Sequence, residues 1–208
     1  MMIEFQNVYF SYKDSDAAIK DISFSIKQGE CTVLCGRSGS GKSTILRTVS
    51  GLAPIFYDGT LQGKIEVDKR IPAELESEER AKLFGVVFQD PRSQFFMNTV
   101  QDEICFAAEN IGVPSNKIKE MLFDVSKFVG IEDLLSRNID ELSSGQKQKV
   151  AIASSLILQP NVLILDEPTS NLDVRGAKVL VEIIKKVKDR GISIIISEHR
   201  LGLFKEVT

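Results

Sequence analysis

Residues 31–44, CTVLCGRSGSGKST, join a short apolar segment directly to a loop of glycine and serine. The segment CTVLC is continuously apolar, as expected of a strand buried on both faces of a parallel sheet. The loop GRSGSGKS (36–43) matches the pattern G-x-x-x-x-G-K-[ST], whose backbone N–H groups surround phosphate oxygens. We expect a helix to begin at Gly41 or Lys42 and to end near Gly51. The stretch therefore predicts an α/β fold that binds a nucleotide phosphate.

Two side chains of this loop carry chemistry of their own. Lys42 can place a mobile positive charge at the β- and γ-phosphates, and the Ser43 hydroxyl can ligate Mg²⁺. An ordinary glycine-rich turn is the competing interpretation, but a chance match directly between a strand and a helix is rare. The residues expected at the phosphates of the nucleotide are Gly36, Arg37, Ser38, Gly39, Ser40, Gly41, Lys42, Ser43 and Thr44.

The segment VLILDEP (162–168) places two acidic residues at the end of another apolar strand. Nucleotides bind at the carboxyl ends of strands in open α/β sheets, so we expect Asp166 near the Mg²⁺ and Glu167 as the general base that activates water. The single histidine, His199, follows ISIIIS (192–197) and is expected at the same edge, within reach of the γ-phosphate. A solvated acidic turn and a structural surface histidine are the plainer alternatives.

The remaining segments extend the α/β pattern. Near the N-terminus the alternation of apolar residues changes parity around Gln6-Asn7, which predicts a bulge or turn between two strand pieces. The segment GVVFQ (85–89) is predicted as another strand. Residues 68–82 are strongly charged and predict a surface connection with a short helix, and residues 99–158 show helical patterns only.

We therefore predict one domain over residues 1–208, a P-loop NTPase with a mostly parallel sheet core, antiparallel β strands at the N-terminus and an inserted α-helical subdomain. The core comprises 1–90 and 159–208, and the helical subdomain comprises 91–158. Between the last two strands we expect an amphipathic helix. Its apolar face is formed by Ala177, Leu180, Val181, Ile184 and Val187.

Composition limits the function classes. A net charge of −3 and a pI near 5.4 give no reason to expect nucleic-acid binding. No apolar run approaches the roughly 20 residues that span a bilayer. Cys31 and Cys35 are predicted as buried thiols on one face of a strand. With Cys105 they make an odd number without metal-site spacing, which indicates a reduced, intracellular protein.

A second segment also has the features of an anion site. In LSSGQKQK (142–149), Ser143 and Ser144 are favourable N-cap residues, and Gly145 allows a ligand to approach the backbone closely. The free N–H groups of a helix N-terminus attract phosphate. The chain thus carries two predicted phosphate sites about a hundred residues apart.

Taken together, the motifs resemble those of ATP-binding-cassette (ABC) ATPases over nearly the whole chain. They occur in the order GRSGSGKST (36–44), Gln89, LSSGQ (142–146), LILDEP (163–168), SNLD (170–173) and His199. The resemblance implies hydrolysis of ATP with Mg²⁺ and explains the two sites, because two such domains dimerise head to tail. The signature residues of one chain would then contact the γ-phosphate of an ATP bound at Lys42 of the other; they are Ser143, Ser144, Gly145 and Gln146.

Further roles follow from the resemblance. Tyr12 would stack on adenine, although Tyr9 is close by and packing on the sheet is an alternative role. Gln89 would contact Mg²⁺ and the attacking water and link the site to a transmembrane partner. Asp173 would communicate across the dimer. Lys42 and His199 would stabilise the charge of the transferring phosphoryl group.

Three features depart from the family pattern. Ser144 occupies a position that is usually glycine, and we expect activity to survive because serine is small. Arg200 follows the histidine, where many members have aspartate. The chain stops at Thr208, so the C-terminal end of the usual domain is expected to be missing, either through truncation or because the chain is half of a two-cassette polypeptide.

Four segments resemble the ATPases of energy-coupling-factor importers, which take up vitamins, cobalt and nickel: VVFQDPRSQFF (86–96), TVQDEICFAAENIGVP (99–114), GLAPIFYDGTLQGKIEVD (51–68) and SEHRL (197–201). This resemblance implies a cytoplasmic protein, peripheral on the inner face of the cell membrane. Its partners would be a second ABC domain, identical or different, and a transmembrane subunit in a groove near Gln89. Phe95, Phe96 and Met97 either line that groove or pack the helical subdomain.

Competing classes lack motifs of their own. A GTPase would need N-K-x-D, and the nearest approach, NKIK (116–119), lacks the aspartate. A P-loop kinase would not explain LSSGQ or SNLD. A soluble ABC ATPase of DNA repair or translation is the main alternative, but neither sustained heptads nor a second cassette is visible. A scaffold without hydrolysis would have lost a catalytic residue, and none is lost.

Overall fold

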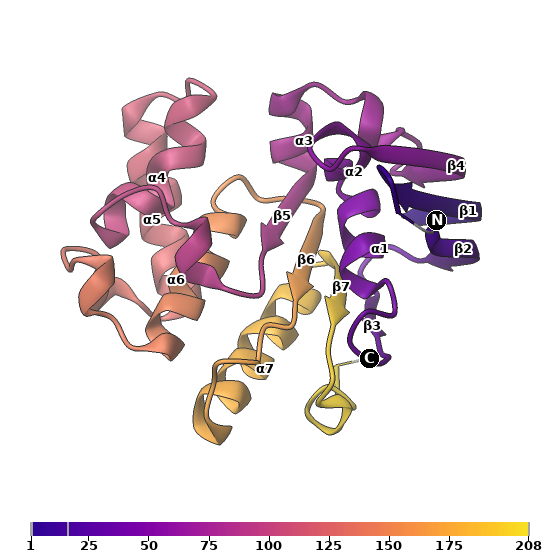
Figure 1. Cartoon of the computed structure of the whole chain (residues 1–208). Helices are drawn as coiled ribbons and strands as arrows, with labels where there is room; N and C mark the ends of the chain where they lie inside the picture. Colours follow the sequence, from indigo (N-terminus) through magenta and orange to yellow (C-terminus); the bar gives the residue numbers. More distant parts are fainter. Residues whose placement is uncertain (1, 16, 208) are drawn as a thin grey trace.

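Two sheets organise the part of the chain that the computed structural model describes, residues 2–15 and 17–207 (Figure 1). The antiparallel sheet has the order β2-β1-β4 and contains β1 (Ile3–Tyr12), β2 (Ala17–Ile26) and β4 (Gly59–Val67). The parallel sheet has the order β3-β7-β6-β5 and contains β3 (Cys31–Leu34), β5 (Phe84–Val87), β6 (Val162–Asp166) and β7 (Ser193–Ser197). The predicted combination of a parallel core with N-terminal antiparallel strands is confirmed.

Strand β1 is irregular where the sequence changes parity. Its register with β2 shifts between Phe5 and Val8, and Asn7 has a φ of 47°. Ile3, Phe5 and Val8 are all buried, so the bulge keeps their side chains on the inner face of the sheet. The predicted irregularity is a bulge within one continuous strand.

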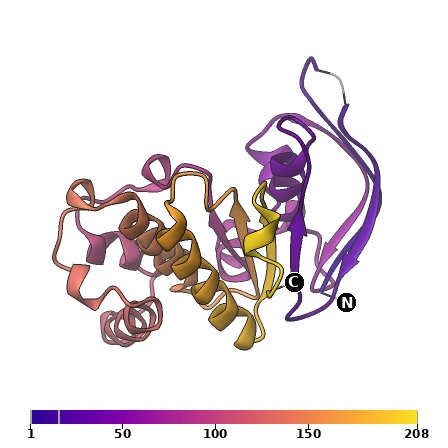
Figure 2. The same cartoon turned by 90° about the horizontal axis from the view of Figure 1, so that it is seen from below.

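Helices cover both faces of the parallel sheet, which is why its strands are almost continuously apolar. Helix α1 (Lys42–Val49) lies between the two sheets, where Leu46 packs in one cluster with Phe5 of β1 and Ile164 of β6. Helix α7 (Val174–Asp189) covers the opposite face (Figure 2). All five residues predicted for its apolar face are buried.

The chain between β5 and β6 forms the helical insertion, with α4 (Val100–Asn110), α5 (Ser115–Val129) and α6 (Ser144–Leu156). These helices lie together beside the β5 edge of the parallel sheet (Figure 1). Two short helices, α2 (Leu52–Ile55) and α3 (Ser77–Leu83), lie earlier in the chain. No helix among the described residues is long and apolar enough to cross a membrane.

Three details differ from the sequence-based expectation. Strand β4 was not predicted. Strand β5 ends at Val87, so Gln89 follows the strand instead of ending it. Strand β3 ends at Leu34, because the chain must leave the sheet to form the phosphate loop. Cys35 is therefore exposed, and its prediction as a buried thiol is wrong, whereas Cys31 is buried.

Candidate nucleotide site

The predicted phosphate loop folds around the ammonium group of Lys42. Its Nζ donates hydrogen bonds to the carbonyl oxygens of Gly36 (3.0 Å) and Arg37 (3.2 Å), and the side chain is only 7% exposed. Gly41 has a φ of 90°, and a Cβ at this position would lie 2.6 Å from the carbonyl oxygen of Ala18. The turn into α1 therefore requires glycine. The loop carbonyl oxygens hold the Lys42 ammonium group, whose ion pair with Glu167 Oε1 is long, at 4.0 Å.

Glu167 is the centre of a cluster of polar side chains. Its Oε2 accepts a hydrogen bond from Gln89 Nε2 at 3.0 Å, and its Oε1 lies 3.0 Å from His199 Nε2 and 4.0 Å from Lys42 Nζ. His199 Nε2 is in turn 3.5 Å from Lys42 Nζ. The four residues predicted to be catalytic come from four distant stretches of sequence, and the fold brings them together.

The backbone around Glu167 explains how this cluster is aimed. Glu167 has a φ of 45°, a left-handed conformation that costs free energy in a non-glycine residue. Its backbone N–H donates to the carbonyl oxygen of Ser197 (3.0 Å) and also to the Ser197 Oγ (3.1 Å), at the end of the neighbouring strand β7. Ser197 Oγ also donates a hydrogen bond to Asp166 Oδ1. Sequence reasoning missed Ser197, because its partners lie about 30 residues away in the chain.

The residues present fit a magnesium ion held mainly by substrate phosphates. Ser43 and Asp166 line one small cavity at the start of α1 and the end of β6. A hydroxyl and a single carboxylate are typical protein ligands where Mg²⁺ also binds phosphate oxygens and water. The described residues contain no group of three or more His, Cys, Asp or Glu that could hold a metal by itself.

Tyr12 lies against the helix that follows the phosphate loop. Its hydroxyl is 3.0 Å from Thr44 Oγ1 and accepts a hydrogen bond from Arg47 Nη1 at 2.9 Å. Its ring packs edge-on against Phe10, with 5.0 Å between the ring centroids. The residue predicted to stack on adenine is thus next to the phosphate loop and is also anchored in the fold.

The second predicted phosphate site is the N-terminus of α6. Ser143 is its N-cap, as predicted: the Ser143 Oγ accepts a hydrogen bond from Gln146 N (3.3 Å), and Gln146 Oε1 accepts one from Ser143 N (2.9 Å). Ser143 and Ser144 are exposed. A Cβ at Gly145 would meet no heavy atom of the described chain within 4 Å beyond its chain neighbours and the adjacent backbone of its own helix, so the space beside this backbone is open.

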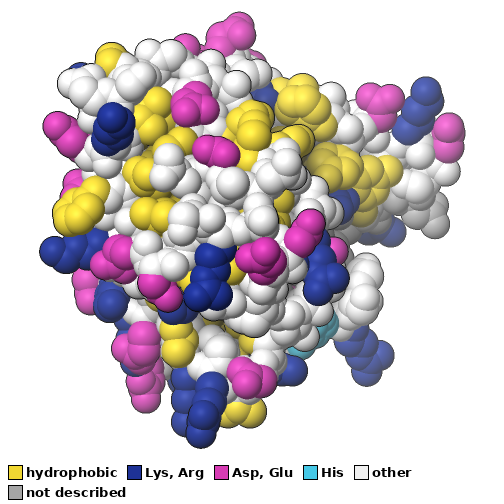
Figure 3. Space-filling view, turned by 90° about the vertical axis from the view of Figure 1, so that its left-hand side faces the viewer, with side chains coloured by type: hydrophobic (Ala, Val, Ile, Leu, Met, Phe, Trp, Pro, Cys, Tyr) yellow, Lys and Arg dark blue, Asp and Glu magenta, His cyan; other side chains and the backbone are white. Residues whose placement is uncertain are grey.

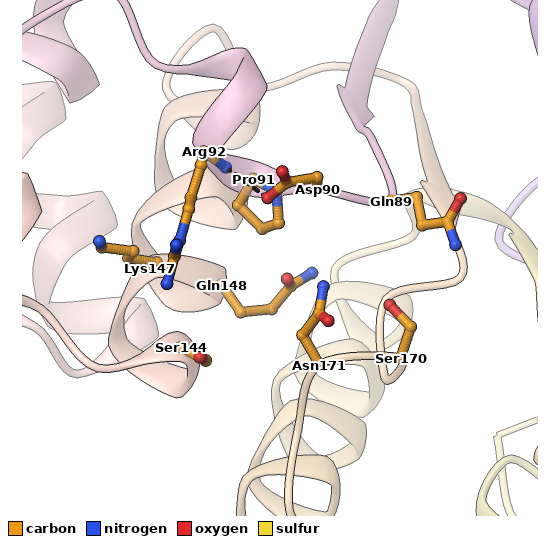
Figure 4. Close-up of a pocket in the computed structure, with 9 residues that line it drawn as sticks. All are labelled: Gln89, Asp90, Pro91, Arg92, Ser144, Lys147, Gln148, Ser170 and Asn171. Atoms are coloured by element: carbon orange, nitrogen blue, oxygen red, sulfur yellow. Dashed lines mark hydrogen bonds between the residues drawn. The ribbon is translucent and has the colours of Figure 1, made fainter.

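Within one chain, the N-terminus of α6 and the phosphate loop are separate sites. Helices α6 and α1 are on opposite sides of β5, β6 and β7 (Figure 1). A cavity of about 500 Å³ beside α6 is lined by residues 89–92 and by Ser144, Lys147, Gln148, Ser170 and Asn171 (Figure 4). A second cavity, of about 460 Å³, contacts residues 143–146 and Asp173, the N-cap of α7. No phosphate-loop residue lines either cavity.

Comparison with known proteins identifies the family. Residues 19–170 match the family model described as ABC transporter. The chain belongs to this family. ABC ATPases bind ATP with Mg²⁺ and hydrolyse it, which confirms the predicted cofactors and the predicted class of enzyme.

Sequence relatives of this ABC ATPase domain are considerably longer proteins. It is 40% identical over 207 residues to a putative ABC transporter ATP-binding protein of Treponema denticola, covering 99% of this chain and 42% of the relative. It is 38% identical over 203 residues to YkoD of Bacillus subtilis, a putative HMP/thiamine import ATP-binding protein, covering 96% of this chain and 37% of that protein. The chain therefore spans about two fifths of these relatives.

Solved structures share the fold. CbiO1 of Clostridium perfringens, described as part of the ABC transporter complex cbiONQ, matches with a TM-score of 0.86 and 33% identity over 97% of this chain and 80% of that chain. The ATP-binding cassette MJ0796, determined as a dimer in a post-hydrolysis state with ADP and Pi, matches with a TM-score of 0.82 and 25% identity over 97% and 90%.

Proposed function

We propose that this ABC ATPase domain hydrolyses ATP in a closed dimer with a second ABC domain. The observation that carries the proposal is the separation of the two phosphate sites within one chain, together with the open space beside Gly145. The dimeric form of MJ0796 supports it. In the dimer, Ser143, Gly145 and Gln146 of one chain reach the γ-phosphate of an ATP held at the partner's phosphate loop.

We propose chemical roles for the central cluster, which comprises Lys42, Gln89, Glu167 and His199. Glu167 acts as the base that takes a proton from water. Gln89 donates a hydrogen bond to Glu167 Oε2 and orients that water. Lys42 and His199 stabilise the negative charge that spreads over the transferring phosphoryl group. Ser43 and Asp166 would hold Mg²⁺, which would neutralise part of the phosphate charge when bound.

A glutamine at position 167 tests the role of the base. Glu167→Gln keeps the size of the side chain but cannot accept the proton, so we predict unchanged ATP binding and a turnover lower by about 10² or more. Steady-state hydrolysis and equilibrium binding of Mg-ATP measure the two quantities. Glu120→Gln, an exposed substitution on α5, is the matched control and keeps wild-type turnover. Wild-type hydrolysis by Glu167→Gln would contradict the assignment.

We further propose that the ATPase powers an importer of the energy-coupling-factor type, for a vitamin or a metal ion such as cobalt or nickel. Two similar proteins support this subclass: YkoD is described as a putative import ATP-binding protein, and CbiO1 is described as part of the ABC transporter complex cbiONQ. The protein would then sit in the cytoplasm against the inner face of the membrane. Substrate recognition would reside in another subunit.

The surface beside β5 supports a membrane partner near Gln89. Phe96 is 75% exposed and stacks on Phe106, with 5.3 Å between ring centroids, whereas Phe95 packs against the core. Phe96 and Phe106 also line a cavity of about 190 Å³. Residues 95–97 were expected either to line the groove for a transmembrane subunit or to pack the helical subdomain. Phe95 packs inside the protein, and the exposed Phe96 is available to a transmembrane subunit.

A soluble ABC ATPase of DNA repair or translation is the alternative. The helices described between β5 and β6 are short, the longest having 15 residues, and form no extended arm. On the face shown in Figure 3, basic and acidic side chains are interspersed, which gives no basic stripe for a nucleic acid on that face. Purifying the tagged full-length protein from native membranes decides between the two. We expect a multi-span membrane protein and a second cassette to copurify; ribosomes or repair factors alone would overturn the importer proposal.

A further inference from the structure

Glu198 is a buried carboxylate between β7 and His199. It is 2% exposed, and its two oxygens have three hydrogen-bond donors. Oε2 accepts from Thr169 Oγ1 at 2.6 Å, and Oε1 accepts from the backbone N–H groups of His199 (2.8 Å) and Arg200 (3.1 Å). A carboxylate is stable in such a place only when hydrogen bonds replace its lost hydration. The turn that carries His199 is therefore fixed by this side chain.

The other end of the Glu198 network belongs to the turn after β6. Thr169, which is fully buried, follows the Asp166-Glu167 pair, and its carbonyl oxygen accepts from Leu172 N at 3.1 Å. That turn leads to exposed residues 170 and 171 and to Asp173 at the start of α7. Thr169 thus connects the histidine turn to the segment that is expected to face a partner chain.

A second contact joins the same two turns. Arg200 Nη1 donates to the carbonyl oxygen of Leu172 at 3.3 Å. The segments 169–173 and 198–200 are therefore linked twice, once through a buried carboxylate and once through a guanidinium group.

We infer that Glu198 is a positioning residue for His199, and that its bond to Thr169 makes the position of His199 depend on the turn 169–173. The inference rests on the proposed function, in which His199 acts at the γ-phosphate. Glu198 holds the backbone N–H of His199, and the ring Nε2 of the same residue lies 3.0 Å from Glu167 Oε1. A partner chain that shifts the turn moves the histidine through these bonds.

The Thr169 hydroxyl offers a clean test, because it lies outside the central cluster. Thr169→Val keeps the shape of the side chain but leaves a buried carboxylate oxygen without its donor. We expect kcat to fall about tenfold, as for a catalytic group held slightly out of place, with little change in KM for ATP. Thr169→Ser retains the hydroxyl and restores kcat.

A spectroscopic readout separates positioning from general destabilisation. His199 is the single histidine of the chain, so its ring resonance in a proton–carbon NMR spectrum is unambiguous. We expect this resonance to move in Thr169→Val and to coincide with the wild type in Thr169→Ser. Identical resonances in all three proteins, or a moved resonance with wild-type kcat, would overturn the inference. Wild-type kcat in His199→Ala would instead show that the proposed role of His199 is wrong.

Discussion

The environment of each cysteine decides its reactivity. Burial raises the pKa of the Cys31 and Cys105 thiols to about 11, and for Cys105 the nearby Glu109 and Asp102 add to the effect. A thiol with a raised pKa stays protonated below that pH, and the thiolate is the nucleophile. Both residues are therefore unreactive at neutral pH, whereas Cys35 is exposed next to the phosphate loop.

We predict that iodoacetamide modifies native protein at Cys35 first, and that Mg-ATP slows this reaction by covering the loop. Modification of Cys31 and Cys105 should accelerate only as the pH approaches their raised pKa. Mass spectrometry of peptides after brief labelling measures the three rates. Faster labelling of either buried cysteine than of Cys35 at neutral pH would contradict the described strand end.

At the scale of elements, the first turn of α6 contains a glycine that helix formation does not favour. Gly145 lies in the first turn of this helix, and an added Cβ meets nothing in the described chain within 4 Å. Alanine is the better helix former, so packing within the described residues does not account for glycine at this position. A ligand that approaches the backbone from outside does account for it.

We predict that Gly145→Ala keeps or slightly raises the melting temperature and lowers ATP hydrolysis at least about tenfold, because the added methyl group obstructs the γ-phosphate. Gly63→Ala is the opposite case. Gly63 has a φ of 86°, and its Cβ would lie 2.3 Å from the carbonyl oxygen of Asn7, so this variant should lose stability. Thermal unfolding and hydrolysis assays on both proteins check the contrast. Full activity of a stable Gly145→Ala protein would refute the role of the signature helix.

The elements that sequence could predict are those with a strong local signal. The apolar strands β6 and β7, the face of α7 and the Ser143 cap follow from periodicity and capping chemistry. Strand β4 was missed because Gly63 interrupts its alternation of apolar residues opposite the bulge of β1. Its pairing partner β1, 47 to 64 residues earlier in the chain, supplies the order that the local pattern lacks.

The candidate site was predictable to the same extent. Sequence motifs predicted Lys42, Glu167 and His199 as site residues. The parallel sheet brings them together because the strands of one parallel sheet end at one edge. The bond between Thr169 and Glu198 could not be predicted, because it spans 29 residues and depends on the register of β6 with β7. Register between distant strands has no local signature in either segment.

At the scale of the whole molecule, the two predicted phosphate sites of one chain lie on different sides of the fold. The phosphate loop lies at the start of α1 and the signature lies at the start of α6, with β5, β6 and β7 between these helices (Figure 1). A head-to-tail pair is the arrangement in which each half meets its complement. The dimer is therefore the unit in which we propose that hydrolysis takes place.

Cross-linking between two different chains tests this claim most directly. In a Glu167→Gln background with its three native cysteines replaced, one chain carries Lys13→Cys, beside Tyr12 and outside the phosphate loop, and the other carries Ser143→Cys, both at exposed positions. A short bis-maleimide should join the mixed chains into a covalent dimer with Mg-ATP and not without it. Absence of the mixed product with saturating Mg-ATP would contradict a site shared between two chains.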